Sequence, residues 1–185
     1  MNLRRWWGLQ KTESVTLEEV EIEWLGLKGK WVADRAQQEA AWELYVELIT
    51  RISVQPLRSG EGLLREALTS MYSLFEETRR ILKEHGPRVA RPLQGGTLSL
   101  GRIAVEVLNL RLRPVLTKWH PLLEAHENSR PAQASPQEHE NSWSRAVELR
   151  TELEDLRIHI LEYASLLAQV SAVDALHAQV PKHGR

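Results

Sequence analysis

A glycine-containing loop flanked by arginines is one part of this chain whose residue types suggest ligand chemistry. Arg88 and Arg91 precede Gly95-Gly96-Thr97, and Arg102 lies in the first turn of the helix predicted beyond them. Free amides at a helix start attract anions, glycine lets a ligand approach the backbone, and arginine binds phosphate through paired hydrogen bonds. The lysine and the second spaced glycine of a P-loop are missing. The loop is therefore a candidate phosphate or carboxylate site, and the alternative is a flexible loop with Thr97 as the helix cap.

Two arginine–histidine pairs form a second candidate. Arg113 precedes His120 with six residues between them, and Arg80 precedes His85 with four. This spacing resembles that of the helical HEPN ribonucleases, and the resemblance implies a pair that acts on a phosphodiester. Pro114 follows the arginine where that family usually has a polar residue, and a chain with 18 arginines and 7 histidines contains about two such pairs by chance. Arg113 and His120 are therefore the catalytic pair of an alternative hypothesis, which their geometry must decide.

No set of residues has the spacing of a metal site. The nearest groupings are His120 with Glu124, and His139 with Glu138 and Glu140. Neither places two imidazoles one helical turn apart, as the His-Glu-x-x-His motif does. We expect no metal and no cofactor, with His120 at a helix end and His139 in solvent.

Length and composition predict one ordinary globular domain. The 185 residues are 42% hydrophobic and 26% charged, with a formal net charge of −1 and no cysteine. Without a net positive field, the chain is not expected to attract nucleic acid through its phosphates. No segment approaches the roughly 18 apolar residues of a membrane span, and no apolar stretch of an export signal follows Arg4 and Arg5. The expected location is therefore cytoplasmic.

Hydrophobic periodicity predicts four helices, at 34–52, 60–85, 98–126 and 135–172. Asp34 and Ser59 are expected caps, and Ser135 with Glu138 forms a capping box. Pro114 predicts a kink in the third helix, and Pro121 a break just before it. The expected fold is all-α: an up-down antiparallel four-helix bundle over 34–173, with a kinked third helix, a long fourth helix and a flexible tail at 174–185.

The fourth predicted helix carries the strongest pattern in the chain. Its apolar residues lie alternately three and four apart: Ala146, Leu149, Leu153, Leu156, Ile160, Tyr163, Leu167 and Val170. This spacing keeps one narrow seam facing a partner helix. The helix is expected to lie against other helices or a second copy, with Leu149, Leu153, Leu156, Ile160, Tyr163 and Leu167 as interface residues.

Residues 1–33 form a separate, tryptophan-rich arm. Val20, Ile22 and Trp24 alternate with glutamates, which favours an extended segment or a small hairpin. A short helix capped at Thr16 is the competing interpretation.

The tryptophans of this arm suit either packing or docking, because tryptophan combines a large apolar area with one donor. We expect Trp24 and Trp31 to pack on the bundle. Trp6 and Trp7, flanked by Arg4 and Arg5, are expected to contact a partner or a membrane surface.

Three segments resemble stretches in a loosely defined group of uncharacterised bacterial all-α proteins. They are Trp24-Leu-Gly-Leu-Lys-Gly-Lys-Trp31, Ala41-Trp-Glu-Leu-Tyr-Val-Glu-Leu48 and Leu112-Arg-Pro-Val-Leu-Thr-Lys-Trp-His-Pro121. The resemblance implies a bacterial cytosolic setting and brings no activity or catalytic residues.

Two hypotheses of function follow from these patterns. The first is a noncatalytic protein–protein interaction module, a scaffold or regulatory subunit that binds a protein partner or a second copy. It follows from an excess of apolar surface on the predicted helices and a lack of polar side chains that converge on one site. The second is an enzyme or sensor that acts on a phosphate-bearing ligand, either an HEPN-like ribonuclease or an anion-binding protein. It predicts that Arg113 and His120 share a cleft, or that Arg88, Arg91 and Arg102 converge.

Overall fold

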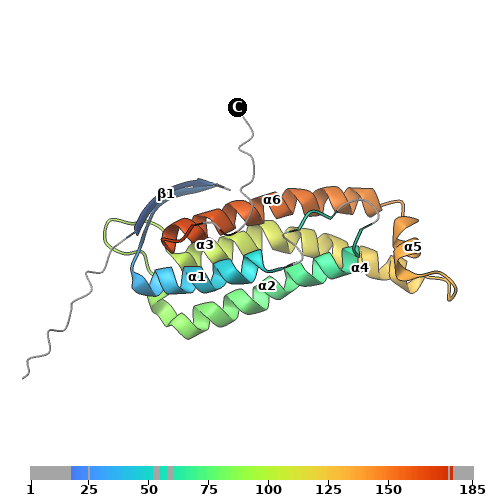
Figure 1. The fold of residues 1–185 in the computed structure, drawn as a ribbon, viewed down its shortest axis with the longest axis horizontal. Helices are drawn as coiled ribbons and strands as arrows, with labels where there is room; N and C mark the ends of the chain where they lie inside the picture. The colour runs from blue at the N-terminus through green and yellow to red at the C-terminus, as the bar shows by residue number, and fades with distance from the viewer. Residues whose placement is uncertain (1–17, 25, 52–54, 58–60, 175, 177–185) are drawn as a thin grey trace, which may run out of the picture.

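The computed structural model of this protein describes residues 18–24, 26–51, 55–57, 61–174 and 176. The chain is mostly helical and also has a two-stranded antiparallel sheet that precedes the first helix. The long helices lie lengthwise beside one another, with the sheet at one end and the short helix α5 at the other (Figure 1). The all-α prediction therefore holds only approximately, because residues 18–33 include the sheet.

The N-terminal sheet is a hairpin of β1 (Glu18–Trp24) and β2 (Leu27–Ala33). The pairing brings Trp24 opposite Leu27, and Gly26 in the turn has φ +83°, a left-handed conformation that glycine adopts without strain. Alternate side chains of β1 face the helices, so Val20 and Ile22 are buried while Glu19, Glu21 and Glu23 are exposed. The extended prediction for this segment is confirmed over the helical one.

Both tryptophans of the hairpin pack on the helices, as the sequence predicts. Trp31 is fully buried, and its indole N–H donates to the Gln37 side-chain oxygen at 2.6 Å. The Trp24 ring stacks on Tyr163 with centroids 5.9 Å apart, and its N–H donates to Glu162 at 2.7 Å. The hairpin is thereby fixed to the start of one helix and the end of another.

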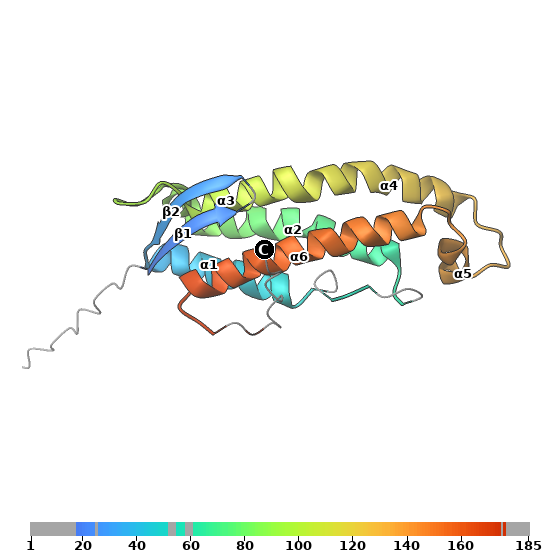
Figure 2. The ribbon, with the colours of Figure 1, turned by 90° about the horizontal axis from the view of Figure 1, so that it is seen from above.

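The helical part runs in the order α1 (Arg35–Ile49), α2 (Leu64–His85), a 3₁₀ segment η2 (Gly86–Ala90), α3 (Leu100–Val107), a π segment η3 (Leu108–Leu112), α4 (Arg113–Asn128), α5 (Pro136–Asn141) and α6 (Ala146–Val170). Helix α1 packs against α2 and α6, and α2 also contacts α4 (Figure 2). Asp34 caps α1 by accepting from the Gln37 amide, as predicted. Helix α2 begins at Leu64, four residues later than predicted, and the expected cap Ser59 lies outside the described residues.

The two prolines of the third predicted helix behave differently from each other. Before Pro114 the backbone widens into the π segment, where the Arg113 amide bonds to the Leu108 carbonyl. A π turn is one known cause of helix irregularity, and here it accommodates the proline where the sequence predicts a kink. The predicted break before Pro121 is wrong, because α4 continues through it. Trp119 and Leu123 are buried on either side of it, so packing holds the helical conformation that proline disfavours locally.

The single long helix predicted for 135–172 is also wrong. The capping box of Ser135 and Glu138 is present, but α5 ends at Asn141 and α6 begins only at Ala146. Three of the four intervening residues, Ser142, Trp143 and Ser144, have lower helix propensity than alanine, leucine or arginine. The Glu140 side chain is buried against the start of α2, and the turn lets α5 leave the axis of α6 to make that contact.

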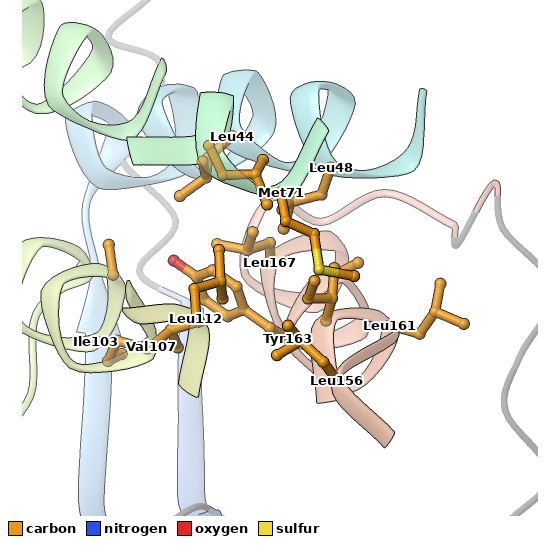
Figure 3. Close-up of a cluster of buried hydrophobic side chains, with 14 of the residues drawn as sticks. Leu44, Leu48, Met71, Ile103, Val107, Leu112, Leu156, Leu161, Tyr163 and Leu167 are labelled. Atoms are coloured by element: carbon orange, nitrogen blue, oxygen red, sulfur yellow. The ribbon is translucent and has the colours of Figure 1, made fainter. Parts of the chain in front are cut away.

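The heptad seam of α6 lies in the core of the chain itself. The eight apolar residues of the seam, from Ala146 through every third or fourth position to Val170, are all buried. They pack with side chains of α1, α2, α3 and η3 (Figure 3). The predicted interface residues Leu149, Leu153, Leu156, Ile160, Tyr163 and Leu167 therefore face other helices of the same chain. The described helices include none that combines the length and the apolarity needed to cross a bilayer.

Tyr163 is the polar exception in this seam. Figure 3 shows it among aliphatic side chains, and its hydroxyl is buried without a hydrogen-bond partner in the described part of the chain. Burial raises the pKa of this phenol far above its usual range. An orphaned buried hydroxyl opposes folding, because it loses its bonds to water and gains none.

Replacing Tyr163 with phenylalanine is expected to raise the free energy of unfolding by about 1 kcal/mol, since only the orphaned hydroxyl is removed. Thermal and urea denaturation would measure the gain. Tyr45→Phe is the matched control, because the Tyr45 hydroxyl accepts from the Leu176 amide at 2.5 Å. The same substitution there should destabilise the protein, and equal signs at both positions would contradict the interpretation of Tyr163.

Candidate functional site

Two adjoining hollows lie between α2 and the continuous α3–η3–α4 segment, and we call them together the α2–α4 groove. Their volumes are about 290 and 300 Å³. The first is lined by Tyr72, Phe75, Arg79, Arg113, Leu116, Thr117 and His120, and the second by Phe75, Thr78, Arg79, Leu82, Lys83, Val105, Leu108, Asn109 and Arg113. Because Phe75, Arg79 and Arg113 line both hollows, one ligand can extend from the first into the second.

Helical spacing explains why these side chains converge. On α2, Tyr72, Phe75, Arg79 and Lys83 follow one another at intervals of three or four residues, so they share one face. On α4, Arg113 and His120 are two turns apart and share the face that looks toward them.

The groove is cationic. Arg79, Lys83 and Arg113 line it, and among its lining residues in the described part of the chain none is aspartate or glutamate. The Arg113 side chain is held in place: its Nε donates to the Asn109 side-chain oxygen at 3.0 Å, and its guanidinium carbon lies 5.2 Å from the centre of the Phe75 ring. A chain of net charge −1 thus concentrates positive charge beside two aromatic rings.

His120 closes one end of the groove. Its Nδ1 lies 2.9 Å from Nη1 of Arg65, and the Tyr72 ring packs edge-on against it at 5.8 Å. Its other ring nitrogen, Nε2, is buried and has no hydrogen-bond partner among the described residues. Burial first, and then the Arg65 guanidinium, lower the pKa of His120 below its usual range.

Arg65 is itself held by a carboxylate. Its Nε lies 3.0 and 3.1 Å from the two oxygens of Glu127, and its Nη2 lies 2.6 Å from one of them. The guanidinium therefore faces Glu127 with one edge and His120 with the remaining Nη1. This fork uses the planar geometry that distinguishes arginine from lysine.

The structure thus brings Arg113 and His120 to one hollow, which is one of the two arrangements that the phosphate-ligand hypothesis predicts. The other arginine–histidine pair, Arg80 and His85, contacts carboxylates outside the groove. Arg80 donates to Glu77 and Glu84 at 2.9 and 2.7 Å, and His85 Nε2 lies 2.8 Å from Glu43. These are exposed or partly exposed side-chain pairs that stabilise helix surfaces.

The glycine loop before α3 uses its amides internally. The amides of Thr97 and Leu98 donate to the Lys30 carbonyl at 2.8 and 3.0 Å, and the Gly96 amide donates to Leu93. The Thr97 hydroxyl accepts from the Lys30 amide, and the cap of α3 is Ser99 rather than Thr97. The loop therefore continues the hairpin edge, and these amides do not point at a free anion site.

The loop arginines are solvent-exposed. Arg88 and Arg91 lie on the surface, and Arg102 pairs with Glu106 at 3.0 Å on α3. Gly95 has φ +85°, which serves the turn itself. Trp6 and Trp7, the other predicted contact residues, lie outside the described residues.

The acidic residues beside His139 have structural partners. Glu138 accepts from Ser135 in the capping box, and Glu140 accepts from the Leu64 amide. The His139 ring stacks on His126 with centroids 3.9 Å apart, and each Nε2 lies within 2.9 Å of the other residue's carbonyl. Within the described ranges, no three histidine, aspartate or glutamate side chains cluster as a metal site.

The sequence patterns did not single out three groove residues of α2, namely Tyr72, Arg79 and Lys83. Tyr72 and Phe75 followed by Arg79 and Lys83 form a stripe with aromatic and cationic residues three or four apart. This stripe could have indicated the groove. The apolar periodicity of α2, however, predicts that Phe75 is in the core and that Arg79 and Lys83 are in solvent.

The groove can bind an anion through guanidinium and ammonium groups and can cover a planar group with its aromatic rings. Among its described lining residues, hydroxyl groups belong to Tyr72, Thr78 and Thr117. No protein-family model, no curated protein sequence and no solved structure matches this chain.

Proposed function

We propose that this protein binds a phosphate-bearing ligand in the α2–α4 groove. The observation that carries the proposal is the composition of the groove wall, in which Arg79, Lys83 and Arg113 stand beside Tyr72 and Phe75 with no lining carboxylate. Arginine recognises phosphate oxygens through paired, charge-assisted hydrogen bonds. In this proposal the long helices form the up-down four-helix bundle predicted from the sequence, and they serve as a rigid frame for the groove in a cytoplasmic protein.

The shape of the groove favours a ligand larger than a lone ion. Phe75, Arg79 and Arg113 sit where the two hollows meet, so a phosphate placed between the guanidiniums has space on both sides. Tyr72 is 62% exposed at one of those sides and offers a ring face or edge to a planar group. A nucleotide or a short stretch of single-stranded nucleic acid has this combination of phosphate and planar base.

Charge reversal tests the proposal. Calorimetric titration of inorganic phosphate, a nucleoside monophosphate and a short single-stranded RNA should show binding of at least one probe by the wild type. Arg79→Glu with Arg113→Glu should weaken that binding about a hundredfold, because two charge-assisted hydrogen bonds are lost. The matched control is Arg88→Glu with Arg102→Glu, which changes the net charge equally at exposed positions of η2 and α3. If the control weakens binding as much, the groove is not the site.

An enzymatic version of this proposal is an HEPN-like ribonuclease, favoured by the placement of Arg113 and His120 in one hollow. It predicts RNA cleavage by the wild type and none by His120→Ala. Unchanged cleavage in that variant would remove this version while leaving ligand binding intact.

A noncatalytic protein–protein interaction module, either scaffold or regulatory subunit, is the second candidate function. Exposed apolar side chains favour it: Val105 and Tyr72 line the groove and are exposed, and Leu110 of η3 is exposed as well. Analytical ultracentrifugation of wild type and Leu110→Glu would test it. A monomer at all concentrations, with no protein retained in pull-down by the wild type alone, would count against it.

A further inference from the structure

We infer that Glu127 and Arg65 fix His120 as a neutral imidazole with its hydrogen on Nε2, so that His120 offers the groove a hydrogen-bond donor. The fixed tautomer follows from the geometry alone. The role of that donor, recognition of a phosphate oxygen, rests on the proposed function.

The contact with Arg65 determines which nitrogen of His120 carries the hydrogen. Nη1 of Arg65 lies 2.9 Å from Nδ1 of His120. A guanidinium can only donate, because it has no acceptor lone pair and stays protonated in proteins. Nδ1 must therefore accept, and in a neutral imidazole the hydrogen is then on Nε2.

Glu127 keeps Arg65 in the orientation that this contact requires. Both of its oxygens face Nε of Arg65 at 3.0 and 3.1 Å, and one also accepts from Nη2 at 2.6 Å. Because Glu127 holds that edge of the guanidinium, the Arg65 side chain cannot rotate freely, and its Nη1 stays directed at His120. Arg65 and Glu127 are thus positioning residues that act through His120.

The charges around His120 also favour the neutral ring. Arg65 approaches from α2, Arg79 and Arg113 line the same hollow, and Glu124 and Glu127 lie on α4. Burial and the Arg65 charge lower the pKa of His120, and the two glutamates oppose them without reversing the direction. A protonated ring would also direct an Nδ1 hydrogen at a donor of Arg65, so protonation breaks the contact.

In this tautomer, Nε2 of His120 is the atom that would donate to a ligand. It is buried and unpaired among the described residues, and a buried N–H without an acceptor is costly. An oxygen of a bound phosphate would supply that acceptor once Tyr72, which packs edge-on against the ring, turns aside. Nε2 in this tautomer has no lone pair for a proton or a metal ion, so His120 is neither a general base nor a metal ligand in this state.

Long-range ¹H–¹⁵N correlation spectra of the full chain test the tautomer directly, with His120 assigned from its absence in His120→Gln. The wild type at neutral pH should show one tautomer with the hydrogen on Nε2. Arg65→Met should give a mixture of tautomers and a higher pKa of His120. Glu127→Gln should give a smaller shift toward the mixture without that rise in pKa, because the Glu127 carboxylate itself raises the pKa of His120. The matched control Arg102→Met should leave the signals unchanged.

Three results would overturn the inference: a hydrogen on Nδ1 in the wild type, an imidazolium at neutral pH, or an unaltered tautomer in folded Arg65→Met. If Arg65→Met does not fold, the wild-type spectrum and Glu127→Gln still decide the question, since the former reports the tautomer itself.

Titration of the wild type and two variants with inorganic phosphate tests the donor role. His120→Ala should weaken binding roughly tenfold, and His120→Gln, which keeps a side-chain N–H, should weaken it less. Equal losses in the two variants would overturn the donor role. If a wild type that shows the Nε2 tautomer binds neither inorganic phosphate nor a nucleoside monophosphate nor a short single-stranded RNA, the proposed function is overturned and the fixed tautomer stands.

Discussion

Replacing Glu140 with alanine is expected to lower the free energy of unfolding by about 3–5 kcal/mol, the usual cost of removing one partner from a buried charge pair. Glu140 is only 5% exposed. One of its oxygens accepts from the Leu64 amide at 2.8 Å, and the other accepts from Nη2 of Arg150 at 3.2 Å. The variant therefore loses contacts with α2 and α6 together.

The groups that Glu140 would abandon have little access to water. Leu64 begins α2, and its neighbour Leu63 has no side-chain acceptor to cap the helix. Arg150 has a side chain only 12% exposed, so water cannot replace the carboxylate easily. Burial raises the pKa of Glu140 above its usual range, and Leu64 and Arg150 only partly offset it. The folded chain therefore binds this proton more tightly than the unfolded chain, and the contribution of Glu140 declines as the pH rises above its ordinary pKa of 4.5.

Urea denaturation at neutral pH would measure the loss, with two comparisons. Glu138→Ala removes a carboxylate from the same short helix, where it is exposed and serves only the capping box, so a much smaller loss is expected. Glu140→Gln keeps an acceptor for the Leu64 amide and should fall between the two. Equal losses for Glu138→Ala and Glu140→Ala would show that the contact with α2 does not stabilise the fold.

The contrast between these two glutamates shows what the sequence could predict. The capping box of Glu138 is a local pattern of four residues, and the alternation of β1 and the heptads of α6 are likewise periodic. Each of these features can therefore be predicted from the sequence alone. Glu140 caps a helix that begins 76 residues earlier, and no periodicity records a partner at that distance. The same contact explains why the predicted long helix is broken.

The groove was only half predictable for the same reason. The offset of Arg113 and His120 is a property of α4 alone, so the sequence could nominate the pair. Their neighbours Tyr72 and Arg79 come from α2, and only the packing of α2 on α4 joins the two faces. The glycine loop shows the opposite error: its composition suits an anion, but β2 takes the amides, and a pairing with residues 67 positions away leaves no local trace.

The second large effect is expected at Gln37, where leucine should cost about 3–5 kcal/mol by orphaning several buried groups at about 1–3 kcal/mol each. Gln37 is fully buried. Its side-chain oxygen accepts from the Trp31 indole at 2.6 Å and from the Leu100 amide at 3.2 Å, and its nitrogen donates to the Arg91 carbonyl at 3.3 Å. One side chain of α1 therefore joins β2, the start of α3 and the loop before it.

A double-mutant cycle with Trp31→Phe separates this network from simple loss of volume. Trp31→Phe alone removes one donor and leaves Gln37 bonded to the Leu100 amide. In the Gln37→Leu background the same change removes an orphaned N–H, so it should cost less or even restore stability. We expect a coupling of at least about 1 kcal/mol from denaturation curves, together with faster hydrogen exchange at the Leu100 amide in Gln37→Leu. Effects that add to within about 0.5 kcal/mol would mean that Gln37 and Trp31 stabilise the protein independently.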